Sequence, residues 1–126
     1  METAKEFMKR KQKRIQEGKA VVKAKDISRK GKFGYKTVKA TFMPQSDLDK
    51  HKVFVLERLE RNLMNGKHGY NNMKIGDIEY RIGYYIVGKN GHLKNKWAWG
   101  QSCPLIPLKD LKKLLTKAEK EGTLLE

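Results

Sequence analysis

The chain has 126 residues, a length typical of a single domain that can bury a modest hydrophobic core. It contains 29 Lys and Arg against 14 Asp and Glu, so its formal net charge is +15 at pH 7. An excess of this size predicts an anionic partner, of which nucleic acid is the usual one, although lysine can also serve solubility alone. Cys103 is the only cysteine, which excludes an intramolecular disulfide and a cysteine-cluster zinc site and favours a reducing compartment.

The sequence favours a cytoplasmic protein without a membrane partner. No apolar run approaches the ~20 residues that cross a bilayer, and the first residues lack the apolar core of a signal peptide. The positive charge is concentrated early, because residues 1–40 hold 14 Lys and Arg against 4 Asp and Glu. This asymmetry predicts a basic N-terminal helix or arm over residues 1–18, followed by an α+β domain over residues 19–126.

The first predicted element is a helix over residues 2–17. Most of its residues favour helix, its apolar residues are few, and Gly18 supplies a stop. Residues 19–27 and 33–43 then alternate in polarity and are rich in β-branched and aromatic residues, which predicts two strands. The basic segment 28–32 would form the turn between them.

Residues 47–64 are predicted to form a second helix. Pro44 breaks the preceding strand, and Ser46 with Asp49 has the spacing of a capping box. Leucines follow at helical spacing, which predicts an amphipathic helix. The run KVFVL inside this segment would by itself also suit a strand.

A second hairpin and a last helix complete the chain. Residues 78–87 carry Ile or Tyr at every second position, residues 88–95 form a basic turn, and residues 96–101 return as the second strand. Residues 108–121 follow with a leucine stripe and predict a helix that ends at Gly122.

The predicted order is therefore αββαββα. It indicates an α+β single domain, in which an antiparallel four-stranded sheet of two β-hairpins carries its helices mainly on one face. One face of strand 78–87 would then lie under helices 47–64 and 108–121, as part of the core. That face carries Ile78, Tyr80, Ile82, Tyr84 and Ile86.

The two tryptophans of the second hairpin have two alternative positions. Trp97 and Trp99 share one face of their strand, and that face coincides either with the isoleucine face or with the face of Arg81 and Tyr85. In the second case these four residues would form an exposed cationic and aromatic platform. Such platforms stack single-stranded bases at about 1–3 kcal/mol per base. The hairpin register decides between the two, and the sequence leaves it open.

Catalytic chemistry has little support in the sequence. His51, His68 and His92 lack the spacing of a metal site, and no motif of a phosphate-binding loop or of an activated nucleophile is present. We therefore predict no metal and no cofactor. A nuclease that combines His68 or His92 with Asp77 and Glu79 is the weakest of the three functional hypotheses.

The sequence favours a non-enzymatic nucleic-acid-binding protein that contacts DNA or RNA phosphates through lysine and arginine. The alternative is a small bacterial or phage-like interaction or inhibitor protein that binds an acidic protein or a nucleoprotein. The sequence does not distinguish DNA from RNA or single from double strands, and it does not define the oligomeric state. The residues predicted to contact phosphate are Lys9, Arg10, Lys11, Lys13, Arg14, Lys30, Lys32, Lys36, Lys89, Lys94 and Lys96, and those predicted to contact bases are Arg81, Tyr85, Trp97 and Trp99.

Overall fold

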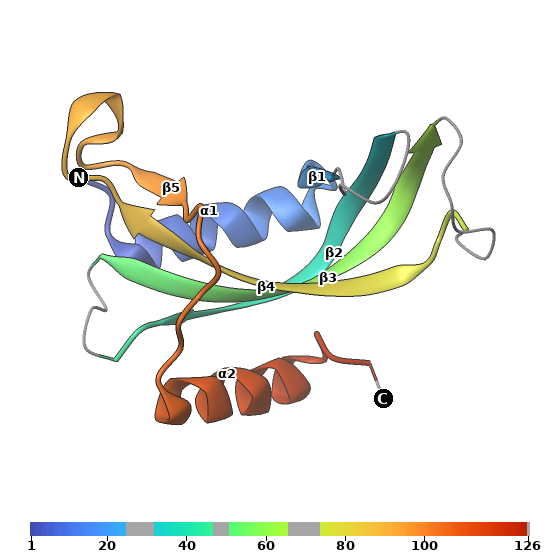
Figure 1. Ribbon diagram of the computed structural model, residues 1–126. Coiled ribbons are helices and arrows are strands. Elements are labelled where there is room, and N and C mark those ends of the chain that lie inside the picture. Colours follow the sequence, from blue (N-terminus) through green and yellow to red (C-terminus); the bar gives the residue numbers. More distant parts are fainter. Residues whose placement is uncertain (25–31, 47–50, 66–73, 126) are drawn as a thin grey trace.

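The fold is a single antiparallel sheet of five strands in the order β1-β2-β3-β4-β5, with a helix on each face (Figure 1). It is seen in a computed structural model that describes residues 1–24, 32–46, 51–65 and 74–125. The α+β class is confirmed, but the sheet has five strands rather than the predicted four. The elements are α1 (Ala4–Gln16), β1 (Val21–Ala24), β2 (Lys32–Pro44), β3 (Lys52–Asn65), β4 (Ile78–Val87), a 3-10 helix (Gly91–Leu93), β5 (Trp97–Trp99) and α2 (Leu108–Glu121).

The helix predicted over residues 47–64 is wrong, because Lys52–Asn65 forms β3, the central strand of the sheet. Val53 and Val55 are buried on one face of this strand, and Phe54 and Leu56 are buried on the other. A strand that is covered on both faces carries a continuous apolar run instead of an alternating one. The apolar residues that we assigned to one side of a helix therefore pack alternately into the two core clusters on opposite faces of the sheet.

The predicted capping box does not cap a helix. The Ser46 hydroxyl donates a hydrogen bond to the side chain of Asp110 on α2, and Asp110 is fully buried. The second residue of the predicted box, Asp49, lies outside the described residues. The contact between Ser46 and Asp110 instead ties the end of β2 to the start of α2.

The two helices lie on opposite faces of the sheet, which corrects the prediction that helices pack mainly on one face (Figure 1). Phe7 of α1 is fully buried, and Met8 and Ile15 of the same helix pack on the core of one face. Leu114 and Ala118 of α2 are fully buried in the core of the other face. Because β3 is apolar on both sides, each face needs its own helix.

The isoleucine face of β4 is only partly covered, although we predicted it to be core. With residues 52–65 in the sheet, α2 alone remains to cover this face, and it packs against Phe54 and Leu56 of β3. Tyr84 packs at the edge of that cluster. Four side chains of the face are 37% to 41% exposed, namely Ile78, Tyr80, Ile82 and Ile86.

The remaining predicted elements are confirmed with small changes of length. Strand β2 corresponds to the strand expected at 33–43, the hairpin of β4 and β5 is present, and α2 has the bounds expected for the last helix. Strand β1 covers only Val21–Ala24 of the strand expected at 19–27, and residues 25–31, which include most of the expected turn, lie outside the described residues. Helix α1 begins with a capping box that the sequence prediction missed, in which Thr3 and Glu6 bond each other's backbone N–H groups. No helix in the described part of the chain is long and apolar enough to cross a membrane.

Candidate nucleic-acid interface

The register of β4 and β5 settles which face carries the tryptophans. Tyr85 pairs with Trp99, and Val87 pairs with Trp97. Both indoles therefore lie on the face of Arg81 and Tyr85, and this is the second of the two predicted alternatives. It is also the face on which α1 lies.

Helix α1 covers these aromatic side chains instead of leaving them as an open platform. The Phe7 ring stacks on Trp97 with 4.8 Å between the ring centroids and 17° between the planes. It also meets Tyr85 edge-on at 4.8 Å, and the Trp97 indole N–H donates to the carbonyl oxygen of Glu2 at 2.8 Å. In this arrangement Phe7 occupies the position beside Trp97 where a base would stack. Base contact through Trp97 and Trp99 stays a prediction, and stacking of a base on Trp97 in place of Phe7 would require α1 to move.

The Trp99 indole lies against a glycine and an arginine of the neighbouring strand. A Cβ added at Gly83 would lie 2.1 Å from Cη2 of Trp99, so only glycine leaves room for the indole there. The guanidinium of Arg81 lies 4.1 Å from the centroid of the Trp99 ring, a cation–π distance. Gly83 in an otherwise bulky strand was the available sequence signal for this close approach.

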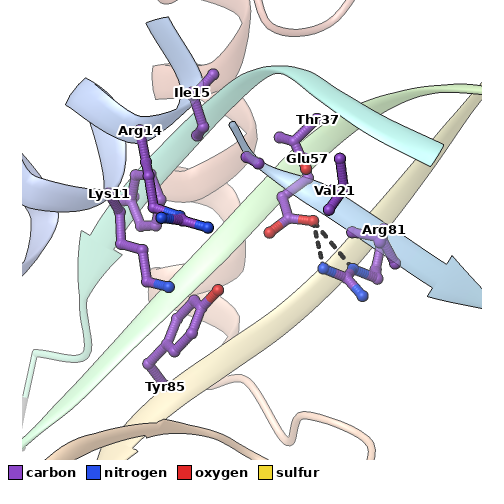
Figure 2. A pocket seen from close by; sticks show the side chains of 11 residues that line it. Lys11, Arg14, Ile15, Val21, Thr37, Glu57, Arg81 and Tyr85 are labelled. Atoms are coloured by element: carbon purple, nitrogen blue, oxygen red, sulfur yellow. Dashed lines mark hydrogen bonds and ion pairs between the residues drawn. The ribbon is translucent and has the colours of Figure 1, made fainter. Parts of the chain in front are cut away.

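A small pocket of about 180 Å³ separates α1 from the sheet (Figure 2). Lys11 and Arg14 enter it from α1, Glu57 from β3, and Arg81 and Tyr85 from β4. Glu57 and Arg81 are cross-strand neighbours, and the guanidinium donates to Oε2 of the carboxylate from Nε at 3.0 Å and from Nη2 at 2.7 Å. Of the predicted site residues, Lys11, Arg14, Arg81 and Tyr85 are thus brought together, whereas Glu57 was not predicted.

The electrostatics of this pocket are governed by burial. Burial raises the pKa of Glu57, and the neighbouring Arg81 offsets part of that rise. Burial also lowers the pKa of Lys11, with repulsion from Arg10 and Arg14 in the same direction. Burial, followed by the charge of Glu57, raises the pKa of Tyr85 to about 12. Three cationic side chains face one carboxylate, so the pocket carries an excess of positive charge.

The outer side of α1 is a row of exposed cations. Lys5, Lys9 and Lys13 are exposed and follow one another at intervals of four residues, which places them on one side of the helix. Lys5 was not among the predicted contacts, although the same spacing would have included it. Arg10 and Arg14 are exposed beside this row, and Arg10 binds Glu2 at 2.8 Å.

The β4–β5 loop lies beside the N-terminal end of α1 (Figure 1). Lys89, Lys94 and Lys96 are all exposed in this loop. The contacts of Trp97 with Phe7 and with the Glu2 carbonyl hold the loop and the helix end together. Two cation groups that are far apart in the sequence are therefore neighbours in space.

The cations predicted from the first hairpin are less well defined. Lys36 is exposed on β2, and its Nζ lies near Gly18, because a Cβ added at that glycine would be 3.2 Å away. Lys32 begins β2, but its side chain lies outside the described part. Lys30 also lies outside the described residues.

The structure does not assemble the nuclease residues that it describes. Asp77 and Glu79 lie at the start of β4, whereas His92 follows its end, so the ten residues of the strand separate them by roughly 30 Å. The Glu79 carboxylate instead accepts hydrogen bonds from Arg61 Nη2 at 2.9 Å and from the Tyr35 hydroxyl at 2.8 Å. His68 is outside the described residues, and among the rest no group of three or more His, Cys, Asp or Glu could hold a metal.

Comparisons with protein-family models, with curated proteins and with solved structures give no match. The fold, the charges and the contacts described above therefore carry the functional argument.

Proposed function

We propose that this protein binds nucleic acid without catalysing a reaction, through a surface that we name the basic α1 surface. The observation that supports the proposal is the orientation of α1. Its apolar side is anchored on the sheet by Phe7, and its cations are exposed. The β4–β5 loop, whose lysines are also exposed, lies beside its N-terminal end (Figure 1). The basic α1 surface consists of Lys5, Lys9, Arg10, Lys13 and Arg14 of α1 with Lys89, Lys94 and Lys96 of the loop.

The spacing of these charges suits a phosphate backbone more than a base edge. Successive lysines in the row Lys5, Lys9 and Lys13 are about 6 Å apart along the helix axis, at 1.5 Å of rise per residue. Glu6, an acid near this row, is held by Thr3 in the capping box. Lysine contacts to phosphate confer affinity and position but little sequence information. The proposed mode therefore predicts a steep salt dependence and a weak sequence preference.

The test compares two triple variants that remove the same charge from opposite faces of the sheet. One variant carries Lys5→Gln, Lys9→Gln and Lys13→Gln on α1. The matched control carries K112Q, K113Q and K120Q, which change exposed lysines of α2. Binding of labelled single-stranded DNA, duplex DNA and RNA is measured by fluorescence anisotropy at several salt concentrations.

We expect the α1 variant to bind at least about tenfold more weakly and to lose about two to three units of the salt slope, since each phosphate contact contributes about 0.7–0.9. The α2 control should change affinity by less than about threefold, through net charge alone. Equal losses in both variants would contradict the basic α1 surface. No binding by the unmodified protein even at low salt would overturn the proposal itself.

A protein partner is the second candidate, and the exposed apolar face of β4 is the observation that favours it. Ile78, Ile82 and Ile86 keep more than a third of their side-chain surface exposed. Patches of this kind are typical of protein contacts. The patch lies on the face opposite α1, so a protein that binds there would leave the basic α1 surface free.

A further inference from the structure

One edge of the sheet is open along the first half of β4. Strand β5 pairs with β4 only over Tyr85–Val87, and just before that the Gly100 N–H donates to the Tyr84 carbonyl at 2.8 Å. From Ile78 to Gly83, no strand lies beside this edge in the part of the chain that the structure describes. In Figure 1 the segment from β5 to α2 passes across β4 nearer the end of the strand that pairs with β5.

The main-chain groups of alternate residues point toward this open edge. The Tyr84 carbonyl faces the β5 side, and main-chain groups in a strand alternate in direction from one residue to the next. Ile78, Tyr80 and Ile82 therefore direct their N–H and C=O groups outward. The odd-numbered residues bond β3 or its flank, as Val87 does through its N–H to the His51 carbonyl at 3.0 Å.

We propose that a second copy of this chain adds to the edge, with the two β4 strands antiparallel around a two-fold axis at Tyr80. In this register Tyr80 lies opposite Tyr80 of the second copy, and Ile78 lies opposite Ile82. These residues are the ones with outward main-chain groups, so each pair exchanges both of its hydrogen bonds. The side chains of all three lie on the α2 face, where the isoleucines of the two copies meet.

Charge selects this register over its neighbours. With the axis at Tyr80, Glu79 lies opposite Arg81 of the second copy, and the reverse pair forms at the other end. The two nearest registers, with the axis at Glu79 or at Arg81, would set that charge against the same residue of the second copy, and like charges destabilise a cross-strand pair. An axis at Ile78 would set Asp77 against Glu79, which are also two like charges. An axis at Ile82 would set Arg81 against Gly83, so the ion pair would be lost. It would also require the Tyr84 carbonyl to accept a hydrogen bond from the second copy, although this carbonyl already accepts one from the Gly100 N–H.

Both charged side chains are accessible for this contact. The Glu79 side chain is 44% exposed while it binds Arg61, and the Arg81 side chain is 31% exposed while it binds Glu57. Both side chains therefore keep exposed surface for a contact across the axis. The pairs lie on the α1 face, so the isoleucine contacts and the ion pairs stabilise opposite faces of the joined sheet.

The amino-acid composition of this edge is compatible with pairing to a second chain. Proteins protect open edges with proline, with charged residues, especially lysine, or with bulges, because a flat apolar edge invites pairing with another chain. The charges of this edge, Glu79 and Arg81, are of opposite sign and complement each other in the proposed register. The segment IEYRIG has no proline and no lysine, and β4 pairs with β3 without a bulge along it. A five-residue edge buries less surface than a standard interface, so we expect a dissociation constant in the micromolar range.

Repulsion between two chains of charge +15 opposes the contact, so added salt should strengthen it. The axis at Tyr80 runs perpendicular to the sheet, so both α1 helices would lie on the same face of the dimer. A dimer of this form would present two basic α1 surfaces side by side.

The experiment measures self-association of the full chain by sedimentation velocity, from about 5 to 500 μM, in low and in moderate salt. Ile78→Lys places a charge on the open edge. Ile86→Lys is its matched control, because Ile86 has the same 39% exposure on the same face but pairs with Ala98 of β5. Ile82→Pro is a second edge variant, since proline removes an N–H that points away from β3.

We expect the unmodified protein and I86K to dimerise, with I78K and I82P at least tenfold weaker. A wild-type protein that remains monomeric at 500 μM would overturn the proposal. Dimers of unchanged affinity in both I78K and I82P would also overturn it. Either of these results would leave the proposed nucleic-acid binding untouched, because the basic α1 surface lies within one chain.

Discussion

Replacement of Phe7 by alanine should loosen the whole α1 layer. Phe7 is fully buried, stacks on Trp97 and meets Tyr85 edge-on. Truncation of a buried phenylalanine typically costs about 3–5 kcal/mol, and each aromatic pair accounts for about 0.5–1.5 kcal/mol of the attraction that is lost. For a domain with a total stability of about 5–15 kcal/mol, this predicts a fall of Tm by about 10–20 °C.

The assay combines thermal unfolding, followed by circular dichroism, with tryptophan emission at room temperature. F7A should unfold at the lower Tm and show red-shifted emission, because Trp97 loses the ring that covers it. Lys9→Ala is the control on the exposed side of the same helix, and it should change stability by less than about 0.5 kcal/mol. If F7A matched K9A in both Tm and emission, α1 would not be anchored through Phe7, and the reasoning would fail.

Two further predictions concern the face under α1. Gly83→Ala should destabilise the protein by about 1–3 kcal/mol and shift the emission of Trp99, because the added Cβ meets the indole; chemical denaturation measures this, and unchanged stability would show that Trp99 moves aside freely. Burial raises the pKa of Glu57, so the folded chain binds a proton more readily than the unfolded chain, and the contribution of Glu57 to stability falls as the pH rises. The stability of Glu57→Gln relative to wild type should therefore increase between about pH 4 and pH 7; the opposite trend would show that the bonds to Arg81 outweigh burial.

Local sequence signals predicted the elements whose residues alternate in polarity or carry an apolar stripe. The strands β1, β2 and β4 and the helix α2 were identified from alternation or from a leucine stripe. Strand β3 was missed because its apolar residues face two helices, so its pattern lacks the period of two that distinguishes a half-buried strand from a helix. That single error also affected the predicted positions of the helices. Because residues 52–65 form a strand instead of a helix, α2 is the one helix on its face of the sheet in the described part of the chain.

The candidate site also has a part that the sequence predicted and a part that it did not. Composition and spacing predicted every cation of the basic α1 surface except Lys5, because exposed charges depend little on tertiary contacts. The cover of Phe7 over Trp97, and the pairing of Glu57 with Arg81, depend on contacts between residues far apart in the chain. Neither contact has a signature within a local stretch of sequence.

The most direct test of the proposed function is a map of amide chemical shifts during titration of the isotope-labelled protein with a short single-stranded DNA, and again with RNA. The account predicts that the perturbed amides cluster on α1 and on the β4–β5 loop, and that the perturbations decline as salt is added. Amides of α2 should stay unchanged, because that helix lies on the opposite face. Perturbations centred on α2, or none at all at low salt, would contradict the account.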